Sequence, residues 1–527
     1  MPTITERRTL MGHENESSLS VVNRQSKHSK LFAEQVCEQF LDSIRRRVPY
    51  VPDQGHGFYI SNGARIYPEV GGHPEWASPE CSNPRDLAAY DQSCERLMLA
   101  GAQWLREDEG IEVDVTRHCI GVVTPNSITF SQHESYLSWT SRWFDFRQLL
   151  PHMVSRTIYA GAGCLSSDPN GCGFELSQRT RHLTKSVSDD TQSNRGIVCS
   201  RLRKATDRCP RGTWARLHQI SKDSQRSPDA HYLTCGSTAL VIHGLRIASF
   251  CKVIERLTIQ DPVASIRDVS RNPLLQFKIP LKHGPSLTAL EMQRILCDAC
   301  ARFVDRGDGP DWAPHLVNYW RTTLNLLDTN PLFLAPSHDA YLRWQIFNQQ
   351  IRRAGATWRR VHLALRIVDQ LRRAQPRHNL SKAIEAIERG KTLPDEMLVQ
   401  LREAGFADQF DPLDLQLVMR LKAVDLDLHR IGGLYDQLRK AGTVSWSVID
   451  ENDVQRAMVE PPIDTRAAPR GQLIKQLANE PGWRCNWDGF YNDQTGSSHT
   501  LSDPFQLQAG PHGGTLTDES HLYDIPF

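Results

Sequence analysis

The chain has 527 residues, enough to bury a large core and to form about three or four units of domain size. Its 62 lysines and arginines nearly balance 61 acidic residues, so net charge gives no reason to expect binding to nucleic acid or to an anionic membrane. No apolar run is long enough to cross a bilayer, and residues 1–12 lack the apolar centre of a signal peptide, which predicts a cytoplasmic protein.

The first half of the chain mixes helical and extended patterns. Residues 1–11 are predicted to be a flexible tail, and residues 30–48 repeat apolar side chains at helical spacing. Residues 55–81 combine Gly, Pro and residues that favour strands, which predicts short strands separated by turns. A second helix is predicted for 87–105. From about 115 to 245, short apolar runs alternate with polar loops, as in a mostly antiparallel sheet with some helices.

The second half is mainly helical. Helical spacing is clear over 287–303 and 342–450, and from about 451 a small α/β domain is predicted to extend to 527. Seven arginines and a single acidic residue occur from Arg352 to Arg373. Two interpretations of this basic segment remain open: a docking surface for an acidic partner, or the solvated face of an amphipathic helix.

The 13 cysteines follow no regular spacing, which fits reduced cytoplasmic thiols better than a disulfide framework. Cys297 and Cys300 form a Cys-x-x-Cys pair inside a helical pattern, without a second pair nearby. We therefore expect both to pack within a helix rather than to bind zinc or exchange electrons.

Two carboxylates near the start of the chain are candidate metal ligands. In a strand, Glu14 and Glu16 would lie on the same face, because side chains alternate with period two. Two such carboxylates repel each other unless a cation lies between them, and their oxygens suit Mg²⁺ and its nucleotide phosphates. Considered alone, such a pair is more often two solvated carboxylates on a surface strand than a metal site.

Further polar residues gather in five later places. The turn-rich segment 62–81 contains three glutamates, a histidine and a tyrosine, although loops rich in Gly and Pro collect polar residues for structural reasons too. His133 lacks a second histidine at i+4, so it is not part of a zincin helix and, considered alone, is a structural histidine. Segments 176–182, 216–218 and 464–471 supply arginines suited to phosphate or carboxylate. The sequence contains neither a Walker A loop nor a Rossmann glycine pattern.

In this order, the motifs resemble those of the Pup ligase (proteasome accessory factor A) and Dop depupylase family. The segments that carry the resemblance are 12–16, 62–67, 73–76, 80–81, 133–137, 176–179, 216–218 and 461–471. The resemblance implies an α+β fold like that of glutamine synthetase, with a curved antiparallel sheet, helices on one side and a small C-terminal α/β domain. It implies a catalytic domain over 12–450, with an extra helical segment at about 350–410, and a C-terminal domain over 451–527.

The family resemblance also implies a site for ATP and Mg²⁺ in the concave face of the sheet. The implied metal-site residues are Glu14, Glu16, Tyr67, Glu75, His133 and His218. The implied contacts to ATP or substrate are Arg65, Arg179, Arg216, Arg466 and Arg470. Where the family has an aspartate as general base, this chain has Glu69, which reaches one methylene further.

The implied activity is that of an ATP-dependent ligase. It would phosphorylate the side-chain carboxylate of the C-terminal glutamate of a small Pup-like modifier and join it to a lysine of a protein target. The 45 residues between Glu16 and Asn62, and the sequence Asp-Pro-Phe at 503–505, favour a ligase over a Dop-like deamidase or depupylase. A small-molecule carboxylate–amine ligase and a non-catalytic binding protein also remain open.

Two departures from the family pattern mark this chain as divergent. Of the polar stretch expected before His133, only Asn126 remains nearby. The family's Asn-Thr-Arg-Asp-Glu-Pro-His run, expected near 199–206, is replaced by a more basic sequence. The sequence therefore leaves open the modifier, whether it ends in Glu or Gln, its targets and the oligomeric state.

Overall fold

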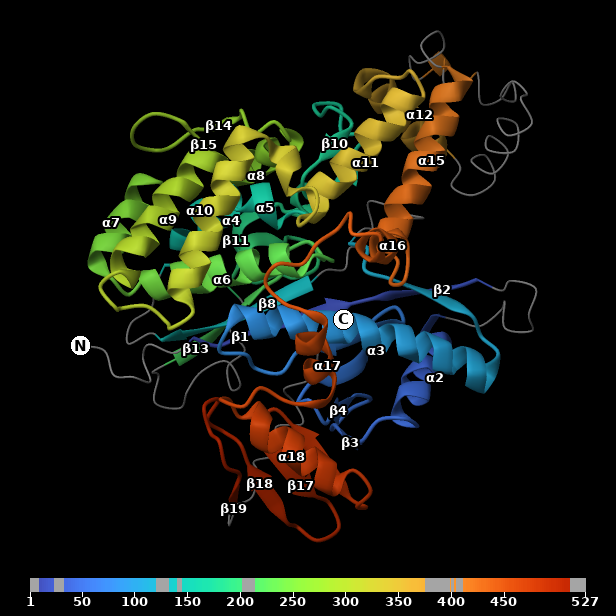
Figure 1. The fold of residues 1–527 in the computed structure, drawn as a ribbon, viewed down its shortest axis with the longest axis vertical. Coiled ribbons are helices and arrows are strands. Elements are labelled where there is room, and N and C mark those ends of the chain that lie inside the picture. The colour runs from blue at the N-terminus through green and yellow to red at the C-terminus, as the bar shows by residue number, and fades with distance from the viewer. Residues whose placement is uncertain are drawn as a thin grey trace.

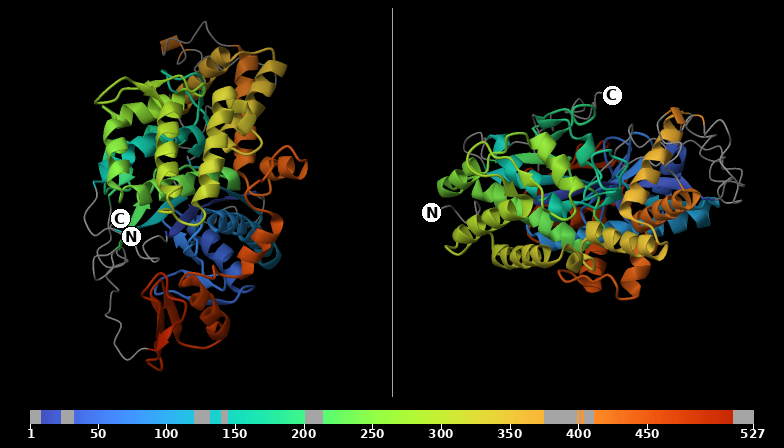
Figure 2. Two further views of the ribbon diagram at one scale, coloured as in Figure 1. Left: turned by 60° about the vertical axis from the view of Figure 1, so that its left-hand side comes forward. Right: turned by 90° about the horizontal axis from the view of Figure 1, so that it is seen from above.

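The protein is described by a computed structural model that covers residues 9–22, 33–119, 132–139, 145–200, 214–374, 399, 402–403 and 411–511. Within these residues the fold is α+β, as predicted. A curved sheet lies at the centre, most helices lie above it in Figure 1, and a small C-terminal unit lies below it. The same order is visible in the turned view on the left of Figure 2.

The central sheet has seven strands in the order β13-β8-β1-β6-β5-β4-β3. Every neighbouring pair is antiparallel. The strands are β1 (Met11–Glu16), β3 (Tyr50–Pro52), β4 (Phe58–Ile60), β5 (Arg65–Glu69), β6 (His73–Ala77), β8 (Gln132–Trp139) and β13 (Trp214–Gln219). Strands β4 to β6 confirm the short strands predicted for 55–81. The central position of β1 places the first motif of the chain in the middle of the sheet.

Strand β1 has one buried face and one open face, as the alternation of its side chains requires. Met11, His13 and Asn15 are buried, whereas Glu14 and Glu16 are only partly buried. The tail predicted for 1–11 extends too far, because residues 9 and 10 are buried and β1 begins at residue 11. This burial reflects backbone hydrogen bonds that residues 10 and 11 exchange with segments distant in sequence.

Two predicted helices cover the buried face of the sheet. Helix α2 (Ala33–Arg45) lies within the predicted range 30–48, and α3 (Pro84–Glu109) contains the range 87–105. The side chain of Asn83 caps the first turn of α3 by accepting a hydrogen bond from the backbone of Arg85. Gly110 ends the helix in the left-handed conformation. In Figure 1, α3 crosses in front of the sheet.

A body of helices packs above the sheet. It consists of α4 (Leu150–Ser155), α5 (Thr157–Ala160), α6 (Pro228–Gly244), α7 (Ala248–Arg256), α8 (Pro262–Arg271), α9 (Ala289–Val304) and α10 (Ala313–Thr329), with the 3₁₀ turns η1 (Phe146–Leu149), η2 (Thr180–His182) and η3 (Pro331–Leu334). Helix α6 is buried along its whole length, and both Cys297 and Cys300 are buried in α9, as predicted. Among the described residues, no single helix is long and apolar enough to cross a membrane, although α6 and α7, which meet at 114°, have the length and composition together.

Four two-stranded sheets lie outside the central sheet. They pair β2 (Ser18–Val21) with β7 (Val113–Thr116), β9 (Cys164–Leu165) with β10 (Phe174–Glu175), β11 (Lys185–Ser188) with β12 (Gly196–Cys199), and β14 (Lys278–Ile279) with β15 (Leu287–Thr288). Only the β11–β12 pair is parallel. Turn η2 lies just before β11 in the sequence, so this small sheet follows the loop 176–184 that contains Arg179.

The predicted helical region contains α11 (Asp339–Arg353), α12 (Trp358–Ala374), α15 (Pro412–His429) and α16 (Leu434–Lys440), at the upper right of Figure 1. The apolar stripe of α12 includes Val361, Leu365 and Val368, which are all buried. Most of the segment from 375 to 410 lies outside the described residues. Of the basic residues, Arg360 is already paired with Asp411 and Asp414, so its charge serves the contact between α12 and α15.

The C-terminal unit contains α18 (Ala467–Leu477) and a four-stranded antiparallel sheet of β16 (Trp483–Asn486), β17 (Gly489–Asn492), β18 (Ser498–Thr500) and β19 (Gly510–Pro511). Before it, α17 (Glu451–Val459) packs against α3 of the larger unit. The division into domains at residues 450 and 451 stays a prediction, and residues 512–527 lie outside the described part of the chain.

A buried polar network fixes β1 to helix α3 on the buried face of the sheet. The carboxylate of Asp91 is completely buried and accepts hydrogen bonds from Asn15 at 2.8 Å and from Gln132 at 2.6 Å. Arg117 donates to both oxygens of Asp91, at 2.9 and 3.0 Å, and to Glu95 at 2.6 Å. Burial opposes the charge of Asp91, but Arg117 together with His231 and His13 outweighs it and holds the pKa of Asp91 well below its ordinary value.

We expect Arg117→Met to lower the free energy of unfolding by about 3–5 kcal/mol, because it leaves the buried carboxylate of Asp91 without its arginine partner. Urea denaturation monitored by near-ultraviolet circular dichroism measures the loss. The control is Arg294→Met, which breaks an exposed ion pair with Asp328 and is expected to cost less than about 1 kcal/mol. Equal losses in the two variants would contradict the role of this network.

Candidate active site

The open face of the central sheet brings together carboxylates and histidines from four strands. Glu14 lies opposite His133 in the pairing of β1 with β8, and Glu16 lies opposite Glu75 in the pairing of β1 with β6. His218 lies on β13, opposite Ser135 of β8. Paired residues of neighbouring strands share a face, so the antiparallel register alone gathers these side chains. We call Glu14, Glu16, Glu75, His133 and His218 the cradle cluster.

His133 lies at the centre of the cradle cluster. Its Nδ1 is 3.1 Å from Glu14 Oε2 and 3.9 Å from Glu75 Oε1, and its Nε2 is 3.4 Å from Glu16 Oε1. His218 Nε2 lies 3.3 Å from Glu14 Oε2. The interpretation of His133 as an isolated structural histidine does not describe its surroundings, which are three carboxylates contributed by two other strands.

The surroundings shift the pKa values of Glu14 and Glu75 in opposite directions. Burial opposes ionisation of Glu14, but His218 and the hydrogen bond with His133 outweigh it and hold the pKa of Glu14 well below its ordinary value. Burial, followed by the charges of Glu16 and Glu14, raises the pKa of Glu75 well above its ordinary value. The three carboxylates therefore lie close enough for Glu14 and Glu16 to oppose ionisation of Glu75.

This donor set suits divalent cations. Two groups of three ligand atoms lie within 4.8 Å of one another, Glu14 with His133 and His218, and Glu16 with Glu75 and His133. Carboxylate oxygens are preferred ligands of Mg²⁺, and a cation would relieve the repulsion that raises the pKa of Glu75. The residues therefore fit a metal site, with His133 shared between the two groups.

Tyr67 and Glu69 belong to the same face, one strand further along. Tyr67 lies opposite Glu75, and burial followed by the charge of Glu75 raises the pKa of the Tyr67 hydroxyl well above its ordinary value. Arg65 stacks on the ring of Tyr67 at 4.1 Å and forms an ion pair with Asp53. Arg65 thus supports Tyr67 and carries a charge that Asp53 already balances. Glu69 ends β5 and is partly exposed, as a base that meets an incoming amine must be.

Arg179 is a buried cation without a carboxylate partner among the described residues. Its Nη2 donates to the carbonyl of Ile220 at 2.7 Å, whereas its Nε has no hydrogen-bond partner. Burial lowers the pKa of Arg179, because charge is disfavoured away from water, while Glu16 acts in the opposite direction. A buried and uncompensated guanidinium beside the cradle cluster is suited to an anionic ligand.

Asp223 positions Arg179, a role that the sequence analysis did not identify. This buried carboxylate accepts hydrogen bonds from the backbone of Gln178 and Arg179 at 3.0 and 3.1 Å, and from the hydroxyl of Ser177 at 2.9 Å. It thereby clamps the loop that carries Arg179 to the end of β13. Its position five residues after the Arg-Leu-His motif is the sequence signal that could have drawn attention to it.

Arg216 lies beside the cluster on β13. Its Nη1 donates to the hydroxyl of Ser135 at 3.2 Å and lies 3.6 Å from Glu14 Oε1. About a third of its side chain is exposed. Arg216 therefore both balances Glu14 and borders the open side of the cradle.

The structure places Arg466 and Arg470 in internal ion pairs, and their predicted contacts to ATP or substrate stay a prediction. Arg466 donates to Glu80 and Asp488, and the fully buried Arg470 donates to both oxygens of Glu80. These arginines outweigh burial and lower the pKa of Glu80 to about 2. Among the described contacts, neither arginine reaches the cradle cluster. They join the C-terminal unit to the segment that follows β6, and local sequence could not reveal a partner almost four hundred positions away.

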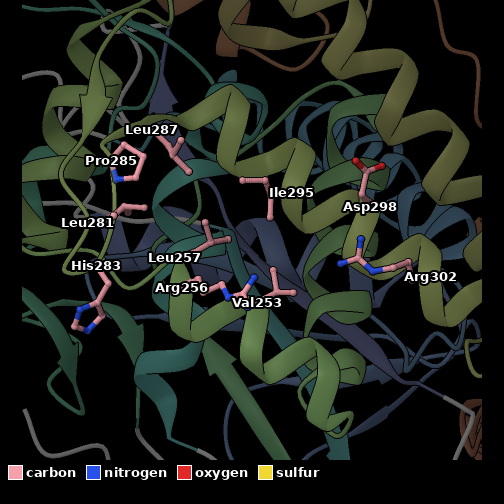
Figure 3. A pocket seen from close by; sticks show the side chains of 11 residues that line it. Val253, Arg256, Leu257, Leu281, His283, Pro285, Leu287, Ile295, Asp298 and Arg302 are labelled. Carbon is pink, nitrogen blue, oxygen red and sulfur yellow. The ribbon is translucent and has the colours of Figure 1, made fainter.

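A separate pocket of about 530 Å³ lies between α7, the β14–β15 hairpin and α9 (Figure 3). Its wall is mostly apolar and also includes the charged residues Arg256, Asp298 and Arg302. It contains none of the predicted site residues. Asn126 and most of the segment 199–206 lie outside the described residues, so the predictions that concern them are not addressed by the structure.

Comparison with known proteins identifies the family of this arrangement. The sequence model of the Pup-ligase protein family matches residues 6–404 and 408–491 of this chain. The chain belongs to the Pup-ligase family. This confirms the resemblance deduced from the ordered motifs.

Relatives of both activities are found among similar proteins. The Pup–protein ligase of Acidimicrobium ferrooxidans is 29% identical over 514 residues, which cover 96% of this chain and 97% of the relative. The Pup deamidase/depupylase of Mycolicibacterium smegmatis is 27% identical over 87% of this chain and 80% of the relative. Membership of the family alone therefore does not separate the ligase from the depupylase.

Solved structures share the fold of this Pup-ligase family member. The complex of the prokaryotic ubiquitin-like protein Pup with its ligase PafA superposes with a TM-score of 0.71, at 20% identity, over 95% of this chain and 90% of that one. The ligase PafA in complex with ADP superposes with a TM-score of 0.65, at 20% identity, over 91% and 92%. The predicted fold, a curved antiparallel sheet with helices and a small C-terminal unit, is thus confirmed.

The cradle predicts stabilisation by Mg²⁺ that depends on Glu75. At a free Mg²⁺ concentration about one hundred times the Kd, a bound ion adds about 2.7 kcal/mol to the free energy of unfolding. We expect the wild-type protein to show a corresponding rise in Tm by differential scanning calorimetry. Glu75→Gln should remove this rise without lowering the Tm in the absence of Mg²⁺, because it relieves repulsion from Glu16 and Glu14.

The matched control is Glu107→Gln, which removes an exposed carboxylate at the end of α3. It should retain the full response to Mg²⁺. An equal response in wild type and Glu75→Gln would exclude Glu75 from the metal site.

Proposed function

We propose that this protein is an ATP-dependent ligase that joins a small Pup-like modifier to lysines of protein targets in the cytoplasm. The observation that carries the proposal is the cradle cluster with the unpaired Arg179 beside it, on the open face of the sheet in a Pup-ligase family member. The near-complete coverage of a Pup–protein ligase supports the same activity.

The reaction requires activation of a carboxylate. A carboxylate is a poor electrophile, and transfer of the γ-phosphoryl group of ATP to the terminal glutamate side chain gives it a good leaving group. The lysine amine then attacks the acyl carbon, phosphate departs, and an isopeptide bond forms. When bound, Mg²⁺ neutralises phosphate charge and polarises the phosphoryl oxygen.

The residues of the cradle divide into three roles in this proposal. Glu14, Glu16, Glu75, His133 and His218 hold the metal, with Tyr67 beside Glu75. Arg179 and Arg216 bind the anionic groups of nucleotide or substrate and stabilise charge that develops during transfer. The fixed positions of these groups on neighbouring strands favour the reaction because no rearrangement of the sheet is needed.

Glu69 is proposed as the general base. The lysine must lose a proton before it attacks, and a carboxylate at the open end of β5 can accept that proton and attract the cationic side chain. The flanking Tyr67 and the glycine at position 57 limit where this strand can lie, because a Cβ at Gly57 would lie 2.7 Å from the Cβ of Tyr67. The additional methylene of Glu69 must therefore be accommodated by the side chain rather than by movement of the strand.

A Dop-like deamidase or depupylase is the second candidate. Pup deamidase/depupylases at 27–28% identity favour it, because they match most of this chain. A small-molecule carboxylate–amine ligase and a binding protein without turnover share the cradle and are separated from the first proposal only by their products.

The deciding experiment is mass spectrometry of products from purified protein with Mg-ATP, a synthetic peptide ending in Glu or Gln, and hydroxylamine. The ligase is expected to release ADP and to form a hydroxamate on the Glu peptide. Deamidation of the Gln peptide without matching ATP consumption would favour the Dop-like activity. ATP binding without either product would contradict both enzymatic proposals for this modifier tail.

Glu69→Gln separates activation from attack. Because hydroxylamine is largely unprotonated at neutral pH, it does not need the base, so hydroxamate formation should fall less than about threefold. Ligation to a lysine substrate should fall by about 100-fold, the usual contribution of a general base. Glu69→Asp, which restores the family residue, should keep most of the ligation activity. Equal losses of the two products in Glu69→Gln would show that Glu69 is not the base.

A further inference from the structure

Several arginines crowd the turn η2, directly after Arg179. Arg181 lies within the turn, and the side chain of Arg267 donates to the carbonyl of Leu183 at 2.7 Å. Arg195 is attached to the same segment through its backbone, because its carbonyl accepts from the amide of Thr184 at 2.9 Å. Segments far apart in sequence therefore converge on one small region beside the central sheet.

Most of this positive charge is not balanced within the described part of the protein. Arg181 has an ion pair with Glu175 at 3.5 Å, whereas Arg179, Arg195 and Arg267 have no ion pair among the described residues. The Nε atoms of Arg179 and Arg267 are buried without a hydrogen-bond partner, and so is Nε2 of His182. Unsatisfied buried donors are rare in native proteins and suggest that a ligand supplies the missing acceptors.

The neighbouring groups confirm that the charges act on one another. Burial, followed by the charges of Arg181, Arg179, Arg195 and Arg267, lowers the pKa of His182 to about 4. Burial and the charge of Arg179 lower the pKa of Arg195, whereas Glu16 and Asp190 act in the opposite direction. Because Arg195 is close enough to respond to Glu16 of the cradle cluster, this basic region adjoins the proposed reaction centre.

We propose that Arg195, together with Arg179 and His182, forms a subsite for an oxyanion carried by a substrate. Arg195 contributes a partly exposed guanidinium whose Nε donates to the carbonyl of Thr191 at 2.9 Å, which leaves its other donors for a ligand. Arg179 directly precedes η2 and donates through Nη2 to the carbonyl of Ile220, just after β13, while its buried Nε has no partner. A planar guanidinium that binds a carboxylate or phosphate through two donors fits this position.

Two substrate groups have the required chemistry, and this part of the inference rests on the proposed ligase activity. Only the side-chain carboxylate of a terminal glutamate is activated, so its α-carboxylate stays free and negatively charged next to the reacting group. A phosphate of the nucleotide is the other source. Both are oxyanions that would provide the acceptors missing around η2.

Isothermal titration calorimetry of Arg195→Met and wild type distinguishes these sources without turnover. The ligands are Mg-ATP, a synthetic peptide ending in Glu, and the same peptide with an α-carboxamide. If the subsite binds the α-carboxylate, Arg195→Met weakens binding of the acid peptide by about tenfold or more, the loss expected for a charge-assisted pair. Amidation should weaken wild-type binding equally and should not weaken the variant further. If the subsite binds phosphate, the same loss appears for Mg-ATP and amidation has no effect.

Two further variants test whether the effect belongs to this subsite. Arg195→Lys should recover part of the affinity, and Arg106→Met, which removes an exposed arginine at the end of α3, should bind all ligands like wild type. Arg195→Met should unfold at the same or a higher Tm, because it removes one of several like charges. Unchanged affinity for both the acid peptide and Mg-ATP, or a lowered Tm together with uniformly weakened binding, would overturn the proposal. A wild-type protein that binds these ligands but forms no hydroxamate would contradict the ligase activity and not the subsite.

Discussion

The rest of the structure depends on the neutralisation of Asp91 beneath the central sheet. This carboxylate is completely buried, and its hydrogen bonds from Asn15, Gln132 and Arg117 join β1 and β8 to α3. A buried charge is tolerated only when its partners are held in place, so the network restricts how the strands can lie. The register of β1 against β8 is therefore fixed from the closed face of the sheet, and the positions of Glu14 and His133 on the open face follow from it.

The two faces of the sheet treat charge in opposite ways. On the buried face, Arg117 and the amides of Asn15 and Gln132 donate to the buried carboxylate of Asp91. On the open face, the carboxylates of the cradle cluster lie close together, and the pKa of Glu75 is raised by burial and by Glu16 and Glu14. Beside them, Arg179 lacks a carboxylate partner among the described residues. Crowded carboxylates and an unpaired arginine are both unfavourable in the protein alone. The same arrangement suits a ligand that brings a cation to the carboxylates and an oxyanion to Arg179.

Stable ion pairs hold the parts that surround this unbalanced site. Glu80 binds Arg466 and Arg470 and so attaches the C-terminal unit near the end of β6. Asp223 binds the backbone of the loop that carries Arg179. In both cases a carboxylate is used by internal donors. Glu80 joins the two units, and Asp223 gives rigid support to Arg179, whose own charge remains available.

The sequence by itself determined the family, the α+β class and much of the site. The alternation in 12–16 placed Glu14 and Glu16 on one face, and helical spacing located α2, because both patterns depend only on neighbouring residues. Tertiary structure decided which charges are balanced. Arg179 and Arg470 both occur in family motifs, yet Arg470 meets Glu80 from a segment 390 positions away, whereas Arg179 meets no described carboxylate. Local sequence cannot distinguish these cases, since the partner of a charged side chain is set by the packing of distant segments.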